Sequence, residues 1–188
     1  MHLIAGLGNP GPQYTGTRHN AGFMALDYLA GIHKLSFTDS RWKALVAKAF
    51  VWDASVLLMK PQAFMNTSGI PVAEAAHFYR LSPEQVIVIH DDLDIECGRV
   101  KFVAGGGDGG HRGIRSLIEQ LGTKNFPRLK IGIGRPPVPV SPERYVLGRF
   151  AAEEKAVLEE CLPAAGEGIR AFLQQGIEAA MNLVNQKK

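Results

Sequence analysis

Short apolar runs alternate along the chain with longer segments in which apolar residues recur at helical spacing. The run Val86–Ile89 has no polar residue among its members, as expected for a central strand that is covered on both faces. Asp53-Ala54-Ser55 separates two other runs and predicts a hairpin between them. Together the apolar runs predict strands at residues 3–7, 42–52, 56–59, 86–89, 100–103 and 129–133.

The segments of helical spacing fill the intervals between these strands. In the first of them Phe23, Leu26 and Leu29 are placed to share one helix face. Ser68 stands where it can cap the second, because a serine side chain accepts hydrogen bonds from the first turn of a helix. The predicted helices are residues 20–35, 68–79, 112–121 and a C-terminal pair within 151–188 that is broken near Gly166 or Gly176.

Strands that alternate with helices in this way predict a three-layer α/β/α architecture. The chain has 188 residues, of which 46% are hydrophobic, so it can form one full core and is too short for two comfortable domains. We therefore expect a single α/β domain over residues 1–188, built on a mixed, mostly parallel twisted sheet.

Charge and cysteine content narrow the class of protein only slightly. Lysine and arginine total 21 against 18 acidic residues, a net charge of +3 that permits an RNA partner without requiring one. Cys97 and Cys161 have neither a CxxC spacing nor a neighbouring histidine, which argues against a zinc site or a disulfide scaffold. The chain opens directly on an apolar strand, and no apolar run approaches the roughly 20 residues that span a bilayer. We expect a soluble, cytoplasmic protein.

Polar side chains stand at or near the ends of several predicted strands, where open α/β sheets bind their ligands. Asp91 follows four apolar residues and must lie at the rim of the sheet or be paired. His19 lies in the loop after the first strand, so a fold that brings these strand ends together would make His19 and Asp91 a candidate catalytic pair. A lone histidine is more often a cap or a surface residue than a base. The alternative is a divalent cation held by His90, Asp91, Asp92 and Asp94, but Asp91 and Asp92 point to opposite faces of a strand and cannot both serve one rigid site.

Two glycine-rich segments partly match the motifs of nucleotide-binding proteins. Gly6-Leu7-Gly8-Asn9-Pro10-Gly11 matches a dinucleotide fingerprint in spacing, but no helix begins inside it, so its backbone cannot meet a pyrophosphate as that motif requires. The segment 105–113 lacks the Gly-Lys-Ser/Thr ending of a P-loop. It precedes a helix that carries Arg112 and Arg115, which suits a phosphate or an RNA backbone. The alternative is a flexible surface loop.

Six motifs, in this order and spacing, resemble the bacterial peptidyl-tRNA hydrolase family over nearly the whole chain. The resemblance weakens only in residues 33–55 and after about residue 155. The motifs are GLGNPGPQYTGTRHNAG, KPQAFMNTSG, VIVIHDDLD, GGGDGGHRGIRSLI, FPRLKIGIGRP and YVLGRF.

The resemblance implies hydrolysis of the ester between a peptide and the 3′-terminal ribose of tRNA, without metal or cofactor. It implies His19 as general base and Asp91 as the carboxylate that orients it. It implies that Asn9 and Asn66 position the peptide and the reacting carbonyl, and that Met65 forms an apolar wall. Tyr14 joins the residues expected to bind substrate. The family is monomeric, so neither an obligate protein partner nor a membrane is expected.

Two positions depart from the family pattern. Arg112 stands where the family motif has an asparagine, and an arginine can donate hydrogen bonds but cannot accept one. We expect it to grip a phosphate or a ribose hydroxyl. Val103 stands where many relatives carry a cation for the tRNA phosphate. The cations expected to supply that charge instead are Lys101, Lys130, Arg128 or Arg99.

The resemblance also implies that residues 136–149 form a flap over the cleft.

Two other functions stay open at this stage. One is an RNA-binding protein that keeps the fold without the chemistry, as in related plant organellar splicing factors. The joint presence of Asn9, His19, Asn66 and Asp91 argues against that loss. The other is a nucleotide-dependent enzyme that uses the glycine-rich segments.

Overall fold

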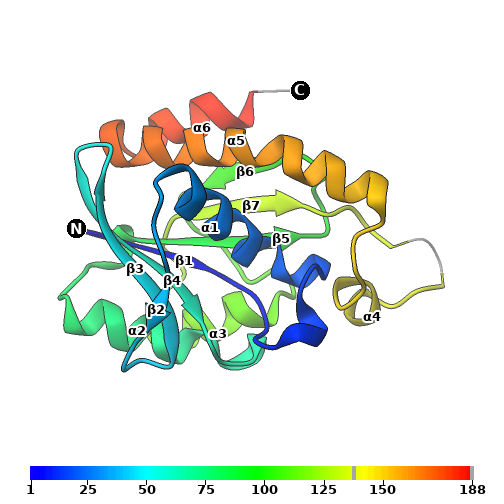
Figure 1. Cartoon of the computed structure of the whole chain (residues 1–188), viewed down its shortest axis with the longest axis horizontal. Coiled ribbons are helices and arrows are strands. Elements are labelled where there is room, and N and C mark those ends of the chain that lie inside the picture. Colours follow the sequence, from blue (N-terminus) through cyan, green and yellow to red (C-terminus); the bar gives the residue numbers. More distant parts are fainter. Residues whose placement is uncertain (137–138, 187–188) are drawn as a thin grey trace.

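The computed structural model describes residues 1–136 and 139–186, and within them seven strands form one mixed sheet (Figure 1). The strand order is β2-β3-β4-β1-β5-β7-β6, which places β1 and β5 near the centre. The strands are β1 His2–Gly6, β2 Thr38–Asp39, β3 Ala44–Val51, β4 Ala54–Pro61, β5 Val86–Asp92, β6 Val100–Val103 and β7 Arg128–Gly132.

The middle of the sheet is parallel and its two margins are antiparallel. Strands β4, β1, β5 and β7 run in one direction, so their C-terminal ends meet at one edge. Ile4 of β1 pairs with Leu58 on one side and with Ile87 on the other. Strand β3 folds back on β4, and β6 runs antiparallel to β7. The prediction of a mixed, mostly parallel sheet is confirmed.

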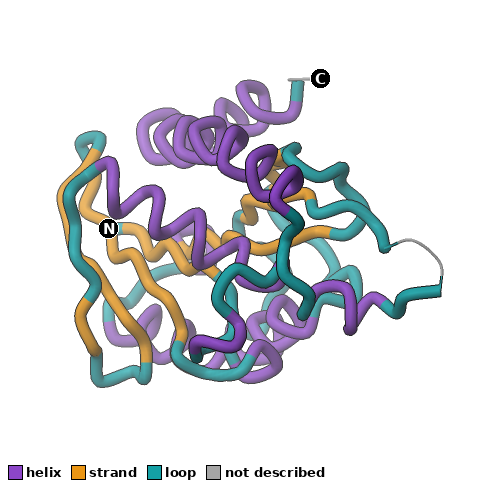
Figure 2. Tube along the Cα trace, turned by 45° about the vertical axis from the view of Figure 1, so that its right-hand side comes forward, coloured by secondary structure: helices purple, strands orange, loops and turns teal. Residues whose placement is uncertain are grey.

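Helices cover both faces of this sheet (Figures 1 and 2). Helices α1, α5 and α6 lie on one face, and α2 and α3 lie on the other. Short 3₁₀ turns at residues 12–14, 18–20, 65–67 and 83–85 join several elements. The α-helices are α1 Ala21–Ile32, α2 Gly69–Phe78, α3 Arg112–Leu121, α4 Pro142–Val146, α5 Ala152–Gln175 and α6 Ile177–Asn185.

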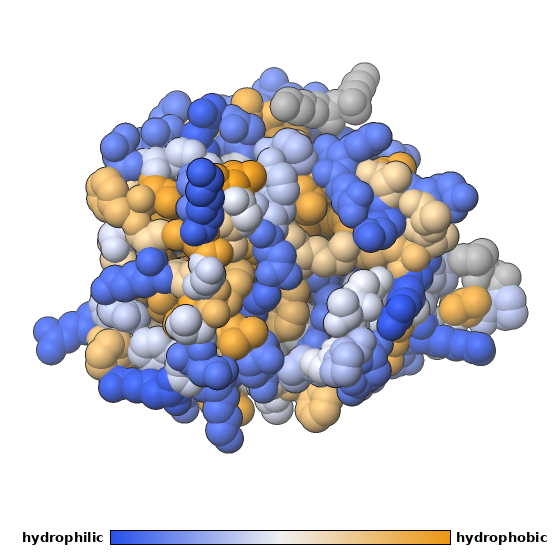
Figure 3. All heavy atoms as spheres, in the orientation of Figure 1, coloured by the Kyte–Doolittle hydropathy of each residue, from blue (hydrophilic) through white to orange (hydrophobic). Residues whose placement is uncertain are grey.

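The two cores follow from the alternation of side chains along the strands. On β5, Val86 and Val88 pack against α2 and α3, whereas Ile87 and Ile89 pack against α1 and α5. All four side chains are fully buried. A central strand apolar at every position is therefore explained by a sheet that is covered twice. On the outer surface, hydrophilic residues cover most of the outline and hydrophobic ones surface between them (Figure 3).

Several predicted elements are confirmed, and two predicted details differ. The hairpin of β3 and β4 and the helix 112–121 appear as expected. Ser68 does occupy the position before α2, but its hydroxyl donates to the carbonyl of Phe64 instead of capping the helix. The C-terminal helices break at Gly176, whose φ of 88° favours glycine, while Gly166 stays inside α5 and packs against α1.

The flap expected at residues 136–149 contains a short helix that the sequence did not predict. Residues 137–138 of this segment lie outside the described part of the chain. The side chain of Ser141 caps α4 by accepting from the N–H of Arg144 at 3.3 Å. None of the helices in the described ranges combines the length and hydropathy that a membrane span requires.

Candidate active site

A cleft of about 620 Å³ lies at the C-terminal ends of the parallel strands. Its walls come from the loops after β1 and β4, the end of β5, the glycine-rich segment and α4. All the expected site residues line it except Lys101, on the edge strand β6, and Arg99, just before that strand, and both are exposed. The fold thus brings together residues that are far apart in the sequence: Asn9, Tyr14, His19, Met65, Asn66, Asp91, Arg112, Arg128 and Lys130.

His19 and Asp91 form a buried hydrogen-bonded pair. His19 lies in the 3₁₀ turn between β1 and α1, and its Nδ1 is 3.0 Å from each carboxylate oxygen of Asp91. The two residues are 8% and 2% exposed. Because a carboxylate can only accept, Nδ1 of His19 carries the proton of this bond. The other ring nitrogen, Nε2, is left as an acceptor.

His111 is a second histidine on the same carboxylate, and sequence reasoning missed it. Its Nε2 lies 3.0 Å from Oδ1 of Asp91. Its Nδ1 accepts from the backbone N–H groups of Gly113 and Ile114, at 3.2 and 3.3 Å, and so caps α3. These contacts leave only one tautomer, with the proton on Nε2 and donated to Asp91. The signal in the sequence was its position directly before the predicted helix 112–121.

The two histidines determine the charge state of Asp91. Burial acts to raise the pKa of its carboxyl, but the ring N–H groups of His19 and His111 outweigh burial and hold that pKa well below its usual range. Asp91 is therefore an ionised acceptor for two imidazoles at any pH near neutrality.

His90 closes the cluster from the other side. Its Nδ1 donates to the backbone carbonyl of Asp91 at 2.6 Å, and its ring packs against that of His111 with centroids 4.8 Å apart. Burial, with a further contribution from His111, lowers the pKa of His90 well below its ordinary value. His90 thus remains neutral and supports the ring of His111.

Asn9 is fixed through its side-chain oxygen, and its amide N–H₂ has no hydrogen-bond partner among the described residues. Its Oδ1 accepts from the backbone N–H of Met65 at 2.8 Å, so its Nδ2 remains as a donor. Asn20, which sequence reasoning did not select, accepts from the N–H of Asn9 at 2.9 Å and donates to its carbonyl at 3.0 Å. A short loop is thereby held rigidly at the end of β1.

The cleft has an aromatic end beyond Asn9. Met65 lines the cleft and is buried, and Asn66 beside it is exposed. The rings of Tyr14 and Phe64 meet edge to face with centroids 6.5 Å apart. By the strand order, this end lies over β4 and β1.

Two of the expected cations, Lys130 and Lys101, lie at the opposite end, on β7 and β6. Lys130 pairs with Asp92 at 2.8 Å, and Lys101 is its register partner on β6. Arg112 at the start of α3 pairs with Glu143 of α4 at 3.0 Å, and both side chains are largely exposed. An exposed pair of this kind contributes about 0–1 kcal/mol, so a stronger anion can displace Glu143.

Arg128 differs from the other cations because it is 1% exposed. Its guanidinium donates to the carbonyls of Gly106, Gly107 and Lys124. It therefore holds the glycine-rich segment in place, and this placement argues against the direct phosphate contact expected from the sequence.

The donor atoms of His19, Asp91 and His111 lie within 4.8 Å of one another, a spacing that also suits a metal ion. A neutral histidine that binds a metal through Nε2 must carry its proton on Nδ1. On His111 that proton would point at two backbone N–H groups. The donor set thus fits a hydrogen-bonded cluster better than a metal centre.

Comparisons with known proteins identify relatives of this chain. Residues 3–188 match the family model described as peptidyl-tRNA hydrolase. A peptidyl-tRNA hydrolase of Desulfitobacterium hafniense is 47% identical over 186 residues, covering 99% of this chain and 100% of that protein. One of Carboxydothermus hydrogenoformans is 46% identical and covers 99% of each chain. A crystal structure of the enzyme from Acinetobacter baumannii aligns with a TM-score of 0.92 at 35% identity, covering 100% of this chain and 96% of the other.

Proposed function

The chain belongs to the peptidyl-tRNA hydrolase family and hydrolyses the ester bond of peptidyl-tRNA, and we propose that it does so through a water molecule activated by His19 and Asp91. The observation that carries the proposal is the orientation of His19. Its Nδ1–H is bound to a buried carboxylate, so Nε2 is the basic nitrogen. An ester has a good leaving group, which makes an activated water sufficient.

In this mechanism Nε2 of His19 takes a proton from the water as the water oxygen attacks the ester carbonyl carbon. The tetrahedral intermediate then collapses as the bond from the carbonyl carbon to the ribose oxygen breaks. The imidazolium returns its proton to the departing ribose oxygen. The Asp91 carboxylate stabilises the imidazolium, and general-base help of this kind is worth about 10²–10⁴ in rate.

Asn9 and Asn66 position the ester. The free N–H₂ of Asn9 is available to the carbonyl oxygen, where negative charge develops in the transition state. Because Met65 holds the Asn9 oxygen, the amide cannot turn to present an acceptor instead. Met65 and Tyr14 supply the apolar surface against which the first peptide residues lie.

Lys130, Lys101 and Arg112 bind the tRNA phosphates in this proposal. Lys130 and Lys101 are supported by their places on β7 and β6, on the side of Asp91 away from the aromatic end, and Arg112 by its exposed place on the cleft wall at the start of α3. Arg112 exchanges Glu143 for a substrate oxygen when tRNA binds. The proposal includes a monomer that works in the cytoplasm without a cofactor or an obligate protein partner, as the family resemblance implies.

The test is release of a labelled peptide from peptidyl-tRNA in excess chelator. The variant His19→Asn keeps an N–H toward Asp91 but has no counterpart of Nε2, so it should still bind tRNA and should lose turnover by about 10²–10⁴. His33→Gln, outside the cleft, serves as the matched control. Retained turnover in His19→Asn would eliminate His19 as the base. No release by the wild type, with tRNA still bound, would favour the RNA-binding alternative.

A further inference from the structure

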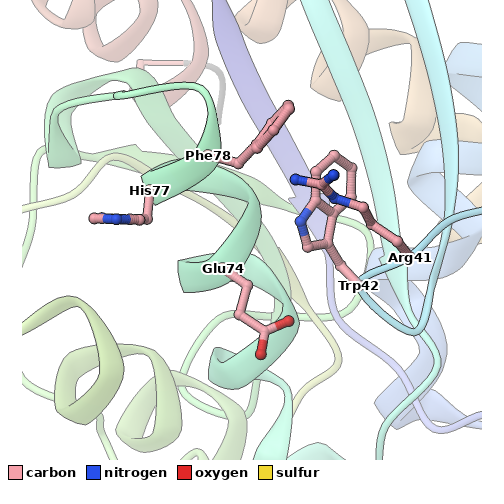
Figure 4. Close-up of a pocket in the computed structure, with 5 residues that line it drawn as sticks. All are labelled: Arg41, Trp42, Glu74, His77 and Phe78. Carbon is pink, nitrogen blue, oxygen red and sulfur yellow. The ribbon is translucent and has the colours of Figure 1, made fainter.

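A second pocket, of about 390 Å³, lies between the start of β3 and the C-terminal half of α2 (Figure 4). Phe78 projects from α2 toward Arg41 and Trp42 in this view. The rings of Trp42 and Phe78 lie 5.5 Å apart, and the guanidinium of Arg41 stacks on Phe78 at 4.0 Å. Nothing in the proposed catalytic mechanism uses these residues.

The catalytic cleft points toward this pocket. Its cationic end lies over β7 and β6, and its aromatic end lies over β4 and β1. If the cationic end holds tRNA, then the peptide on the other side of the ester leaves past Tyr14 and Phe64. Strand β3 lies next to β4 in the strand order and begins just after Trp42 in the sequence.

The exposed face of α2 connects the two sites. Phe64 lines the cleft and is 59% exposed, Ile70 in the first turn of α2 is 44% exposed, and Phe78 in the second pocket is 49% exposed. The backbone also joins them, because the N–H of Gln62, just after β4, donates to the carbonyl of Lys43 at 2.8 Å. Exposed aromatic and aliphatic side chains thus follow one path out of the cleft, and the exposed side chain of Glu74 stands between Ile70 and Phe78 along it.

We propose that this second pocket binds an apolar side chain of the peptide moiety, several residues away from the ester. The proposal rests on the hydrolase function and on tRNA binding at the cationic end. Trp42 and Phe78 offer the apolar surface, and Arg41 covers one ring face while leaving the pocket open to solvent.

The distance sets the peptide length that can reach the pocket. From Asn66 to Phe78 the chain rises by about 18–20 Å at helical rise per residue. An extended peptide covers about 3.3–3.6 Å per residue, so about six residues are needed to span that path. A dipeptide cannot reach the pocket, and a decapeptide can.

The experiment compares N-acetyl-dipeptidyl-tRNA with a decapeptidyl-tRNA that carries apolar residues near position six. The variants are Phe78→Ala and Ile70→Ala, both at half-exposed positions that should fold normally. Phe50→Ala removes another exposed aromatic ring, at the far end of β3, and serves as the control. We expect KM for the decapeptide substrate to rise about five- to tenfold in Phe78→Ala, with the dipeptide substrate and Phe50→Ala unchanged.

Each outcome separates the two proposals. An unchanged KM for both substrates in Phe78→Ala overturns the peptide pocket while leaving the hydrolase mechanism intact. An equal rise for both substrates, with weaker binding of deacylated tRNA, assigns the pocket to RNA and also overturns it. No hydrolysis of the dipeptide substrate by the wild type would instead reject the proposed function.

Discussion

Replacing Asp91 with asparagine tests the arrangement of the site most directly. In the native protein Oδ1 of Asp91 accepts from Nε2 of His111, and both oxygens lie 3.0 Å from Nδ1 of His19. Asparagine has nearly the same size but offers one oxygen and one N–H₂ group. The N–H₂ group of the variant must therefore replace one of the two oxygens beside His19, and Oδ1 is the oxygen that also accepts from His111.

The helix start decides which oxygen that is. To face a donor, His111 would have to move its proton to Nδ1, where Gly113 and Ile114 already donate. Leaving buried polar groups unpaired in this way costs about 1–3 kcal/mol each. His19 has no such constraint, because its other ring nitrogen faces the cleft. We expect the asparagine oxygen to stay on His111 and its N–H₂ to face His19.

His19 then has a donor in place of one of its two acceptors, which favours the tautomer with its proton on Nε2, where it cannot accept a proton from water. The loss combines the general-base effect with the stabilisation of the imidazolium. We expect kcat to fall by about 10³–10⁴, which corresponds to about 4–5.5 kcal/mol in activation free energy. Affinity for tRNA should change little, because the phosphate contacts lie elsewhere.

Single-turnover release of labelled peptide measures this loss, and a melting curve followed by circular dichroism checks that the variant is folded. Asp27→Asn is the matched control, since Asp27 on α1 pairs with Lys60 outside the cleft. A folded Asp91→Asn variant with a rate within about tenfold of the wild type would refute the tautomer argument.

Two further predictions follow from the hydrogen bonds of the cleft. Asn9→Asp keeps the acceptor for Met65 but removes the free donor, so kcat should fall by about 10²–10³ at unchanged thermal stability; an unaltered kcat would remove Asn9 from the reaction. Arg128→Met leaves three loop carbonyls without their buried donor and should lower the free energy of unfolding in urea by about 3–5 kcal/mol, whereas Arg115→Met, at an exposed pair, should change it by less than about 1 kcal/mol. Weaker tRNA binding by Arg128→Met at unchanged stability would restore the phosphate role expected from the sequence.

Much of the fold was readable from the sequence because burial and alternation are local signals. The absence of polar residues in Val86–Ile89 predicted a buried strand. The alternation of strands and helices predicted helices on both faces of the sheet. The break at Gly176 could not be separated from Gly166 in advance. One glycine has a positive φ and the other packs in the interior of a helix, and only tertiary contacts distinguish the two uses.

The candidate site was predictable where a residue lies at a strand end, and less so where partners come from loops. His19 and Asp91 were selected, and the structure places them in contact. His111 was not selected because it lies in the glycine-rich segment, which was interpreted only as a loop or a phosphate site. Its hydrogen bond to Asp91 depends on how that segment folds. Arg128 was expected to bind phosphate because the sequence shows its charge. The sequence does not show the backbone carbonyls to which its guanidinium donates.

The double use of His111 ties the integrity of the fold to the integrity of the reaction. A single planar ring must accept at one nitrogen to start α3 and donate at the other to hold Asp91. No other side chain offers both functions on a rigid frame of that width. A substitution of His111 therefore removes both the cap of α3 and a hydrogen bond to Asp91. A change that loosened the start of α3 would lower turnover before it lowered the stability of the whole protein.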